Sequence, residues 1–121
     1  MAGAMASPKL EVERLADRIR PLLAHESAVA ERRMFGGIAF LVNGNMSVSA
    51  SGQGGLMLRC EPDDTERLVK TPGVARVVMR GREMDGWIRV SAAAIKDDVE
   101  LRRWVDVGVA YARGLPPKSG D

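Results

Sequence analysis

The hydrophobic positions of this 121-residue chain follow a helical period at both ends and a two-residue period between them. Near the start, apolar residues from Val12 to Leu23 recur at helical spacing after Ser7-Pro8, a pair typical of a helix N-terminus. Pro21 should end or kink this helix just before its own position. We therefore predict a first helix over residues 9–24 and a polar connection over residues 25–32.

The next third of the chain has the pattern of a β-meander. Residues 33–42 form the most apolar run, in which Gly36-Gly37 is expected to be a strand kink or a close backbone approach. Asn43-Gly44 follows and is a strong hairpin signal. Residues 46–51 then alternate methionine, valine and alanine with serine, which predicts a half-buried strand with a serine face. A third strand is predicted over residues 56–60.

The pattern changes again after the meander. Residues 62–70 predict a short helix that ends at Pro72-Gly73. Two further strands are predicted over residues 74–80 and 87–90, with residues 81–86 as a polar turn between them. This arrangement adds a second hairpin to the sheet.

A last helix is indicated by a capping box, in which Asp97 precedes Glu100 by three residues. Its apolar face continues to about Arg113, and Gly114 stands where a C-cap is expected. A single helical turn over residues 92–95 precedes it. The chain thus ends, as it begins, with an amphipathic helix.

These elements predict an α+β fold. The order is α-β(3)-α-β(2)-α, in two layers, with a mostly antiparallel five-stranded sheet. The serine face implies that helices cover mainly one face of that sheet. We expect one domain over residues 8–118, with residues 1–7 and 119–121 as flexible ends.

Composition and charge restrict the function further. Eighteen basic residues against 16 acidic ones leave a net charge of +2, which is small for a nucleic-acid-binding protein. A single cysteine excludes an intramolecular disulfide framework, and with a single histidine it argues against a zinc site. The sequence shows no secretory signal and no apolar run long enough to span a membrane. We expect a cytoplasmic protein that does not bind membranes.

No group of residues forms a recognisable catalytic centre. Cys60 ends one predicted strand while His25 follows the first helix, so a cysteine–histidine pair is not expected. The carboxylate pairs Asp63-Asp64 and Asp97-Asp98 stand where helices begin, and capping explains them. We predict that the chain is not an enzyme and has no catalytic, metal-binding or cofactor-binding residues. The aromatic residues expected in the core are Phe35, Phe40, Trp104 and Tyr111.

One basic cluster on the sheet remains as a candidate binding surface. Its residues lie on the third strand and on the last hairpin, where Arg76 is a further neighbour. The candidate binding residues are Arg59, Arg80, Arg82, Trp87 and Arg89. Tryptophan and arginine are enriched in protein interfaces, which favours a protein partner or a homo-oligomer. The same face offers a nucleic-acid surface or a plain solvated face as alternatives.

Several motifs together resemble one known family. They are Arg33-Met34-Phe35-Gly36-Gly37 before the Asn43-Gly44 turn, Leu56–Arg59, Gly81–Trp87, and Trp104-Val105 through Leu115–Lys118. In this combination the chain resembles the N-terminal domain of the TfoX/Sxy proteins over about residues 10–118. The resemblance implies the same α-β(3)-α-β(2)-α fold.

The resemblance also implies a role in regulation. Better-known members of that family act in natural competence, together with a cyclic-AMP receptor protein at promoters, and carry a second, C-terminal domain. This chain is expected to be a stand-alone single-domain member. The resemblance brings no catalytic residue, metal ligand or cofactor. It therefore implies a non-enzymatic regulatory module that acts through protein–protein contacts or self-association, with direct nucleic-acid binding as the alternative.

Overall fold

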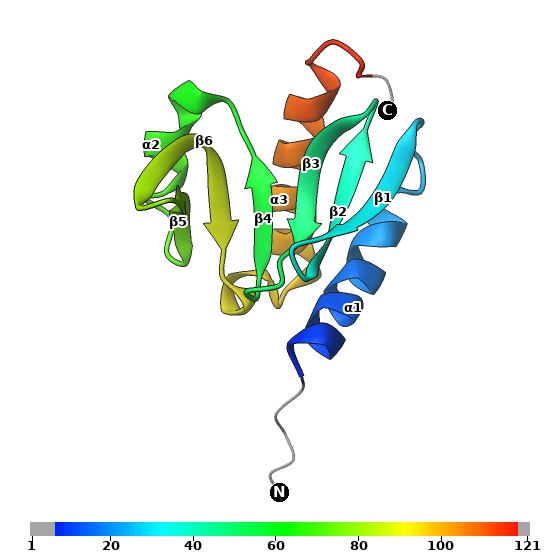
Figure 1. The fold of residues 1–121 in the computed structure, drawn as a ribbon, viewed down its shortest axis with the longest axis horizontal. Coiled ribbons are helices and arrows are strands. Elements are labelled where there is room, and N and C mark those ends of the chain that lie inside the picture. The colour runs from blue at the N-terminus through cyan, green and yellow to red at the C-terminus, as the bar shows by residue number, and fades with distance from the viewer. Residues whose placement is uncertain (1–6, 119–121) are drawn as a thin grey trace, which may run out of the picture.

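The computed structural model describes residues 7–118 as three α-helices and one six-stranded sheet (Figure 1). The helices are α1 (Pro8–Ile19), α2 (Thr65–Leu68) and α3 (Asp98–Arg113). The strands are β1 (Val29–Met34), β2 (Gly37–Val42), β3 (Asn45–Ala50), β4 (Leu56–Arg59), β5 (Val74–Met79) and β6 (Arg82–Val90). Short 3₁₀ turns cover Arg20–Leu23, Pro62–Asp64 and Ala92–Ile95.

The sheet is antiparallel throughout, in the order β1-β2-β3-β4-β6-β5. Helices α1 and α3 pack on the same face of the sheet, behind the strands in Figure 1. No helix of residues 7–118 covers the opposite face, and we call it the open face. The predicted two-layer α+β fold is therefore confirmed, with one more strand than expected.

The additional strand is β1, which lies within the region predicted as a polar connection and within the start of the apolar run. The sequence has no alternating apolar pattern here because β1 is an edge strand, with one hydrogen-bonding neighbour and mostly exposed side chains. The apolar run is correspondingly two strands joined at Phe35-Gly36, not one strand with a kink. Phe35 and Gly36 both have left-handed backbone angles, with φ of +53° and +76°.

Strand β6 also differs from the prediction, because it begins at Arg82 instead of Trp87. Only Arg80 and Gly81 form the turn, with φ of +52° and +78°. Arg82, Glu83 and Asp85 are exposed on this part of the hairpin, and their polarity led to the prediction of a longer turn.

The predicted start of α1 and both predicted ends of α3 are confirmed, whereas two predicted helices are shorter than expected. The helix predicted over residues 9–24 is α-helical only to Ile19 and continues as a 3₁₀ turn, because Pro21 has no N–H to donate. The helix predicted over residues 62–70 is a 3₁₀ turn over Pro62–Asp64 followed by the four residues of α2. The Ser7 hydroxyl accepts a hydrogen bond from the Leu10 N–H (3.1 Å), and α1 ends two residues before Pro21. At α3, the Asp97 carboxylate accepts from the Val99 N–H (2.8 Å), and Gly114 is the C-cap. Apart from Ser7, the ends predicted to be flexible lie outside the described residues.

The core fills the space between the helices and the sheet. Its largest members include Trp104 and Phe40, each 1% exposed, as predicted. Phe35 was expected in the core but is 94% exposed, because the turn after β1 directs it outwards. Tyr111 is only partly buried. The serines of β3 are buried instead of forming a polar surface, because the sheet curves around them and Ser47 sits in a β-bulge, where its hydroxyl donates to the Phe40 carbonyl (2.8 Å).

Candidate functional site

The open face of the sheet carries a row of small and apolar side chains. Strand register places Ala39 beside Ser49, Ser49 beside Met57, and Met57 beside Arg89. Paired residues on neighbouring strands project to the same face of a sheet. This row therefore forms the floor of a surface that runs across four strands.

Both edges of the sheet curve towards that floor. Met34 and Phe35, at the β1 edge, line the same groove as Val77 and Met79, at the β5 edge. On the β5 side the curvature comes from a large β-bulge. Strand β5 passes directly from Arg76, opposite Ile88, to Val77, opposite Met84.

The bulge of β6 is held from the helical side by one threonine. The Thr65 hydroxyl, fully buried at the start of α2, accepts a hydrogen bond from the Gly86 N–H (2.7 Å). Gly86 is itself buried, with φ of +87°, a conformation that glycine adopts readily. A contact on the helical face of the sheet thus fixes the position of the β5–β6 hairpin, which forms one side of the groove.

Replacing Thr65 by valine should lower the free energy of unfolding by about 1.5 kcal/mol, because the Gly86 N–H would be left buried without an acceptor. Urea denaturation followed by circular dichroism measures this loss. Thr65→Ser keeps the hydroxyl and should recover most of the stability. A larger loss in Thr65→Ser than in Thr65→Val would show that the methyl group, not the hydrogen bond, holds the bulge, because valine keeps that methyl and serine lacks it.

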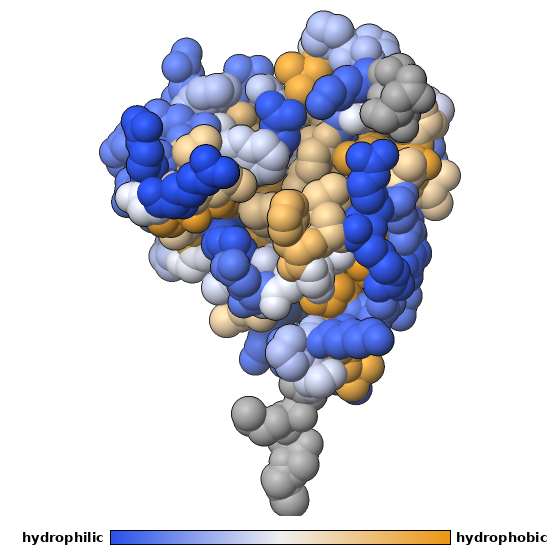
Figure 2. All heavy atoms as spheres, in the orientation of Figure 1, coloured by the Kyte–Doolittle hydropathy of each residue, from blue (hydrophilic) through white to orange (hydrophobic). Residues whose placement is uncertain are grey.

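The groove between the two edges has a volume of about 320 Å³. Its lining is rich in methionine, from four different segments of the chain. These methionines are Met34, Met46, Met57 and Met79. Figure 2 shows hydrophobic residues in the middle of this face, with hydrophilic residues on the β1 side and over the β5–β6 hairpin. Among the described residues, none that lines the groove is acidic.

The predicted arginines surround this groove to different degrees. Arg89 lies on the floor and donates a hydrogen bond to the Ser51 hydroxyl (2.9 Å). Arg80 and Arg82 are exposed at the tip of the β5–β6 hairpin. Arg32, which sequence reasoning did not select, pairs with Ala39 and so projects to the same face from β1.

Arg59 and Trp87 are neighbours in the register of β4 and β6. The Arg59 guanidinium lies 5.0 Å from the centre of the Trp87 ring and 4.9 Å from that of Tyr111 on α3. Its Nε atom is buried and has no hydrogen-bond partner among the described residues. Cation–π contacts of this kind stabilise an arginine between two rings. Arg59 therefore fixes the indole that forms part of the groove and is not itself a groove residue.

Arg76, the further neighbour considered from the sequence, lies away from the groove. It bonds to Glu66 (2.8 Å) and Asp85 (2.9 Å) on the outer side of the hairpin. The hydrogen bond to Glu66, followed by that to Asp85, raises the pKa of the Arg76 guanidinium above its ordinary value. Its charge is already compensated within the chain.

Comparison with known proteins agrees with this architecture. The family model described as the TfoX N-terminal domain matches residues 21–112, about three quarters of the chain. The chain belongs to this family. Neither the curated proteins nor the solved structures compared with it gave a match.

The motifs that carried the resemblance have definite places in this TfoX N-terminal domain. Met34 and Phe35 form one end of the groove, Gly36 completes the turn with Phe35, and Gly37 begins β2. A side chain on Gly37 would meet the Ala50 carbonyl oxygen, which explains the second glycine. Trp87 belongs to the opposite side of the same groove. The motif that contains Met34 and Phe35 and the motif that ends at Trp87 therefore both line the groove of the open face.

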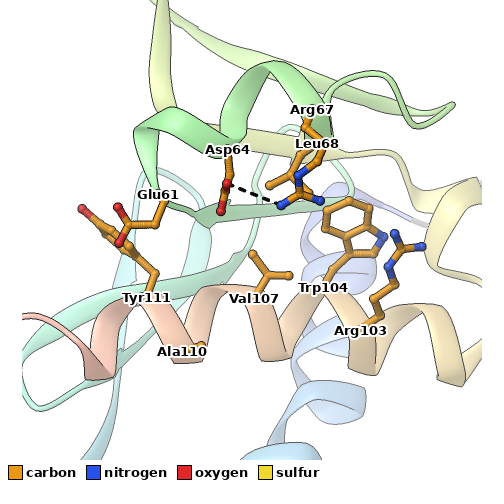
Figure 3. Close-up of a pocket in the computed structure, with 9 residues that line it drawn as sticks. All are labelled: Glu61, Asp64, Arg67, Leu68, Arg103, Trp104, Val107, Ala110 and Tyr111. Atoms are coloured by element: carbon orange, nitrogen blue, oxygen red, sulfur yellow. Dashed lines mark ion pairs between the residues drawn. The ribbon is translucent and has the colours of Figure 1, made fainter.

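A second, more polar cleft lies between α2 and α3 in this domain (Figure 3). Glu61 and Tyr111 lie at one end and Arg103 at the other, beyond an Asp64–Arg67 ion pair of 3.5 Å. Arg103 also bonds to Glu100 (3.5 Å). Since Asp64, Arg67 and Arg103 are each engaged in an ion pair, this cleft offers less free charge than the groove.

The possible nucleophile of the TfoX N-terminal domain is enclosed. Cys60 is 1% exposed, with its sulfur 3.8 Å from the Thr65 hydroxyl, and burial raises the pKa of its thiol. His25 is instead an exposed residue beside Glu26. Within residues 7–118, no group of three or more histidines, cysteines or carboxylates is placed to hold a metal ion. No helix in that range is long and apolar enough to cross a bilayer.

Sequence reasoning therefore found part of this site. It identified Trp87, Arg89 and the hairpin arginines, but not the methionines or the exposed Phe35. Met57 alternates with the core residues Leu56 and Leu58, which was the one available signal for an apolar open face. Met46 shares the two-residue period of core Val48 and reaches the open face only because of the bulge at Ser47. Phe35 gave no such signal, because its exposure depends on the turn that it shares with Gly36.

Proposed function

We propose that this TfoX N-terminal domain is a non-enzymatic interaction module that binds another protein through the groove of its open face. The observation that carries this proposal is the apolar, methionine-rich groove left uncovered on a sheet whose other face is fully packed. Exposed apolar surfaces with a polar rim are typical of protein interaction sites. Methionine side chains are flexible and suit such surfaces. The family supports a TfoX-type module. A regulatory role in transcription is part of the proposal, and it is supported by the resemblance to the TfoX/Sxy proteins.

The chemistry of the groove supports a binding role over a catalytic one. Its lining offers thioether, hydroxyl, amide, indole and guanidinium groups. A general acid or base would need a histidine, a carboxylate or a comparable group within hydrogen-bond reach of the substrate. The residues described around the groove supply no such group.

A cross-linking experiment tests the proposal. Benzoylphenylalanine is placed at Phe35, a natural aromatic position that is 94% exposed at the end of the groove. The control position is Val99, a hydrophobic residue that is 72% exposed at the start of α3. Irradiation in cells that produce the protein should give a discrete protein adduct from position 35 and not from position 99. Adding Met57→Lys, which places a charge on the groove floor, should abolish it.

Other results would assign a different partner. An adduct that nuclease removes would replace the proposal with nucleic-acid binding. An adduct with the mass of two copies of this chain would assign self-association. Equal cross-linking from positions 35 and 99, or none from position 35, would show that the open face binds no protein partner.

A further inference from the structure

We propose that the element of the partner held by this groove is an acidic amphipathic α-helix. Its apolar side chains would contact the methionines and Trp87, and its carboxylates would lie against arginines on both walls. This inference rests on the proposed function, because it names the chemistry of the partner that the groove takes. Three features of the open face carry it: the floor, the width and the unpaired charge.

The floor is apolar and adaptable. Met46 and Met57 are half-buried, and Val78 and Met79 remain 58% and 49% exposed at the β5 edge. A volume of about 320 Å³ accommodates a few apolar side chains, not a whole folded surface. An amphipathic helix presents such side chains along one stripe, at positions i, i+3, i+4 and i+7.

The width of the face fits a helix. In the sheet order, β1 and β6 are four strand spacings apart, which corresponds to roughly 19 Å along the sheet and is an upper limit for the opening, since both edges curve inwards. An α-helix with its side chains is about 10–12 Å across, so one helix fits between the wall residues. A single extended strand would leave much of the floor uncovered.

The charge of the face is mainly positive, with Glu83 opposite Val78 on the hairpin as an acidic neighbour. Seven of the 14 arginines have a carboxylate within ion-pair distance among the described residues, and these lie mainly on the helical side or the outer hairpin. Of the other seven, only Arg14 and Arg102 are on exposed helix surfaces away from the groove. Of the remaining five, Arg59 is held between Trp87 and Tyr111, and the four on the groove or its rim are Arg32, Arg80, Arg82 and Arg89.

This charge distribution selects among the possible occupants. A second copy docked by a two-fold axis would place the same arginines opposite one another, which is repulsive. The arginines could bind the phosphates of a nucleic acid, but a floor of methionine and alanine with one indole offers little for base stacking. A helix with an apolar stripe between acidic flanks matches both the floor and the walls.

A designed peptide tests the assignment directly. The probe is a fluorescein-labelled helix of about 18 residues, long enough at about 27 Å to cross the face, with a leucine stripe between glutamate flanks. One control peptide has the same composition without the stripe, and another has lysine in place of glutamate. Fluorescence anisotropy should show micromolar binding of the probe and about tenfold weaker binding of both controls. Raising the salt from roughly 50 mM to roughly 300 mM should weaken probe binding.

Matched protein variants locate the site. Arg80→Glu with Arg82→Glu should weaken probe binding about tenfold and strengthen binding of the lysine peptide. Arg14→Glu with Arg102→Glu makes the same change in net charge on the helix surfaces and should leave probe binding unchanged. Circular dichroism of all variants checks that the fold is retained.

Three results would overturn the inference. They are equal affinity for the probe and the stripe-free peptide, equal weakening by the two double variants, and displacement of the probe by single-stranded DNA that binds more tightly. A protein adduct at Phe35 together with no preference for the probe would leave the proposed function intact and remove only the acidic helix. Absence of both would remove the two together.

Discussion

Replacing Trp104 by alanine should lower the free energy of unfolding by about 3–5 kcal/mol, because the indole is a large, almost fully buried side chain. It lies on α3 against Leu68 of α2 (Figure 3) and belongs to the central core. Domains of this size are stable by about 5–15 kcal/mol, so the variant should be close to unfolding at room temperature. Urea denaturation followed by far-ultraviolet circular dichroism measures the change.

The two tryptophans of the chain provide the control. Trp87 is only partly buried on the open face, so Trp87→Ala should cost clearly less stability than Trp104→Ala. Trp104→Phe should also cost less, since it keeps most of the packing. A loss below about 1 kcal/mol in Trp104→Ala would contradict the central place of this side chain in the core.

The sequence predicted the starts of α1 and α3 well because their signals are local. Ser7, Pro21 and Asp97 each act within one or two turns of their own position, through a cap or a missing N–H. Such signals do not depend on the rest of the fold. The hairpins at Asn43-Gly44 and around Gly81 were predicted for the same reason.

Features that depend on distant parts of the chain could not be predicted in this way. Strand β1 has no alternating pattern, because an edge strand with exposed faces needs none. The burial of Ser49 and Ser51 follows from the curvature of both sheet edges, which arises from bulges and a tertiary contact to Thr65. No window of neighbouring residues contains that information.

The candidate site also has a part that local sequence signals predicted and a part that they did not. Trp87 and Arg89 could be placed on one face because they are two residues apart on one strand. The groove itself needs Met34 and Met79, from opposite edges, brought over a common floor. An Arg-rich face was therefore predictable, whereas its apolar centre, on which the proposed partner helix depends, required the structure.

Gly108 is a second residue whose role only the structure reveals, and Gly108→Ala should destabilise the domain by about 3 kcal/mol. In an isolated helix the same change would stabilise by about 1 kcal/mol, because alanine is the better helix former. In α3, however, an added Cβ would lie 2.6 Å from the Ser47 carbonyl oxygen and from a Val48 methyl carbon. Thermal and urea denaturation would measure the net effect.

The size of that effect follows from what the new methyl group would meet. Ser47 sits in the β3 bulge, where its hydroxyl bonds to the Phe40 carbonyl, so the backbone there cannot shift without breaking a buried hydrogen bond. Ala110→Gly is the matched control, since Ala110 is exposed on the same helix and should lose only about 1 kcal/mol of helix propensity. If Gly108→Ala instead raised the stability, the close approach of α3 to β3 would not be what requires glycine. If it lowers the stability as expected, the contact that holds α3 to the bulged strand also holds the floor of the open face in place.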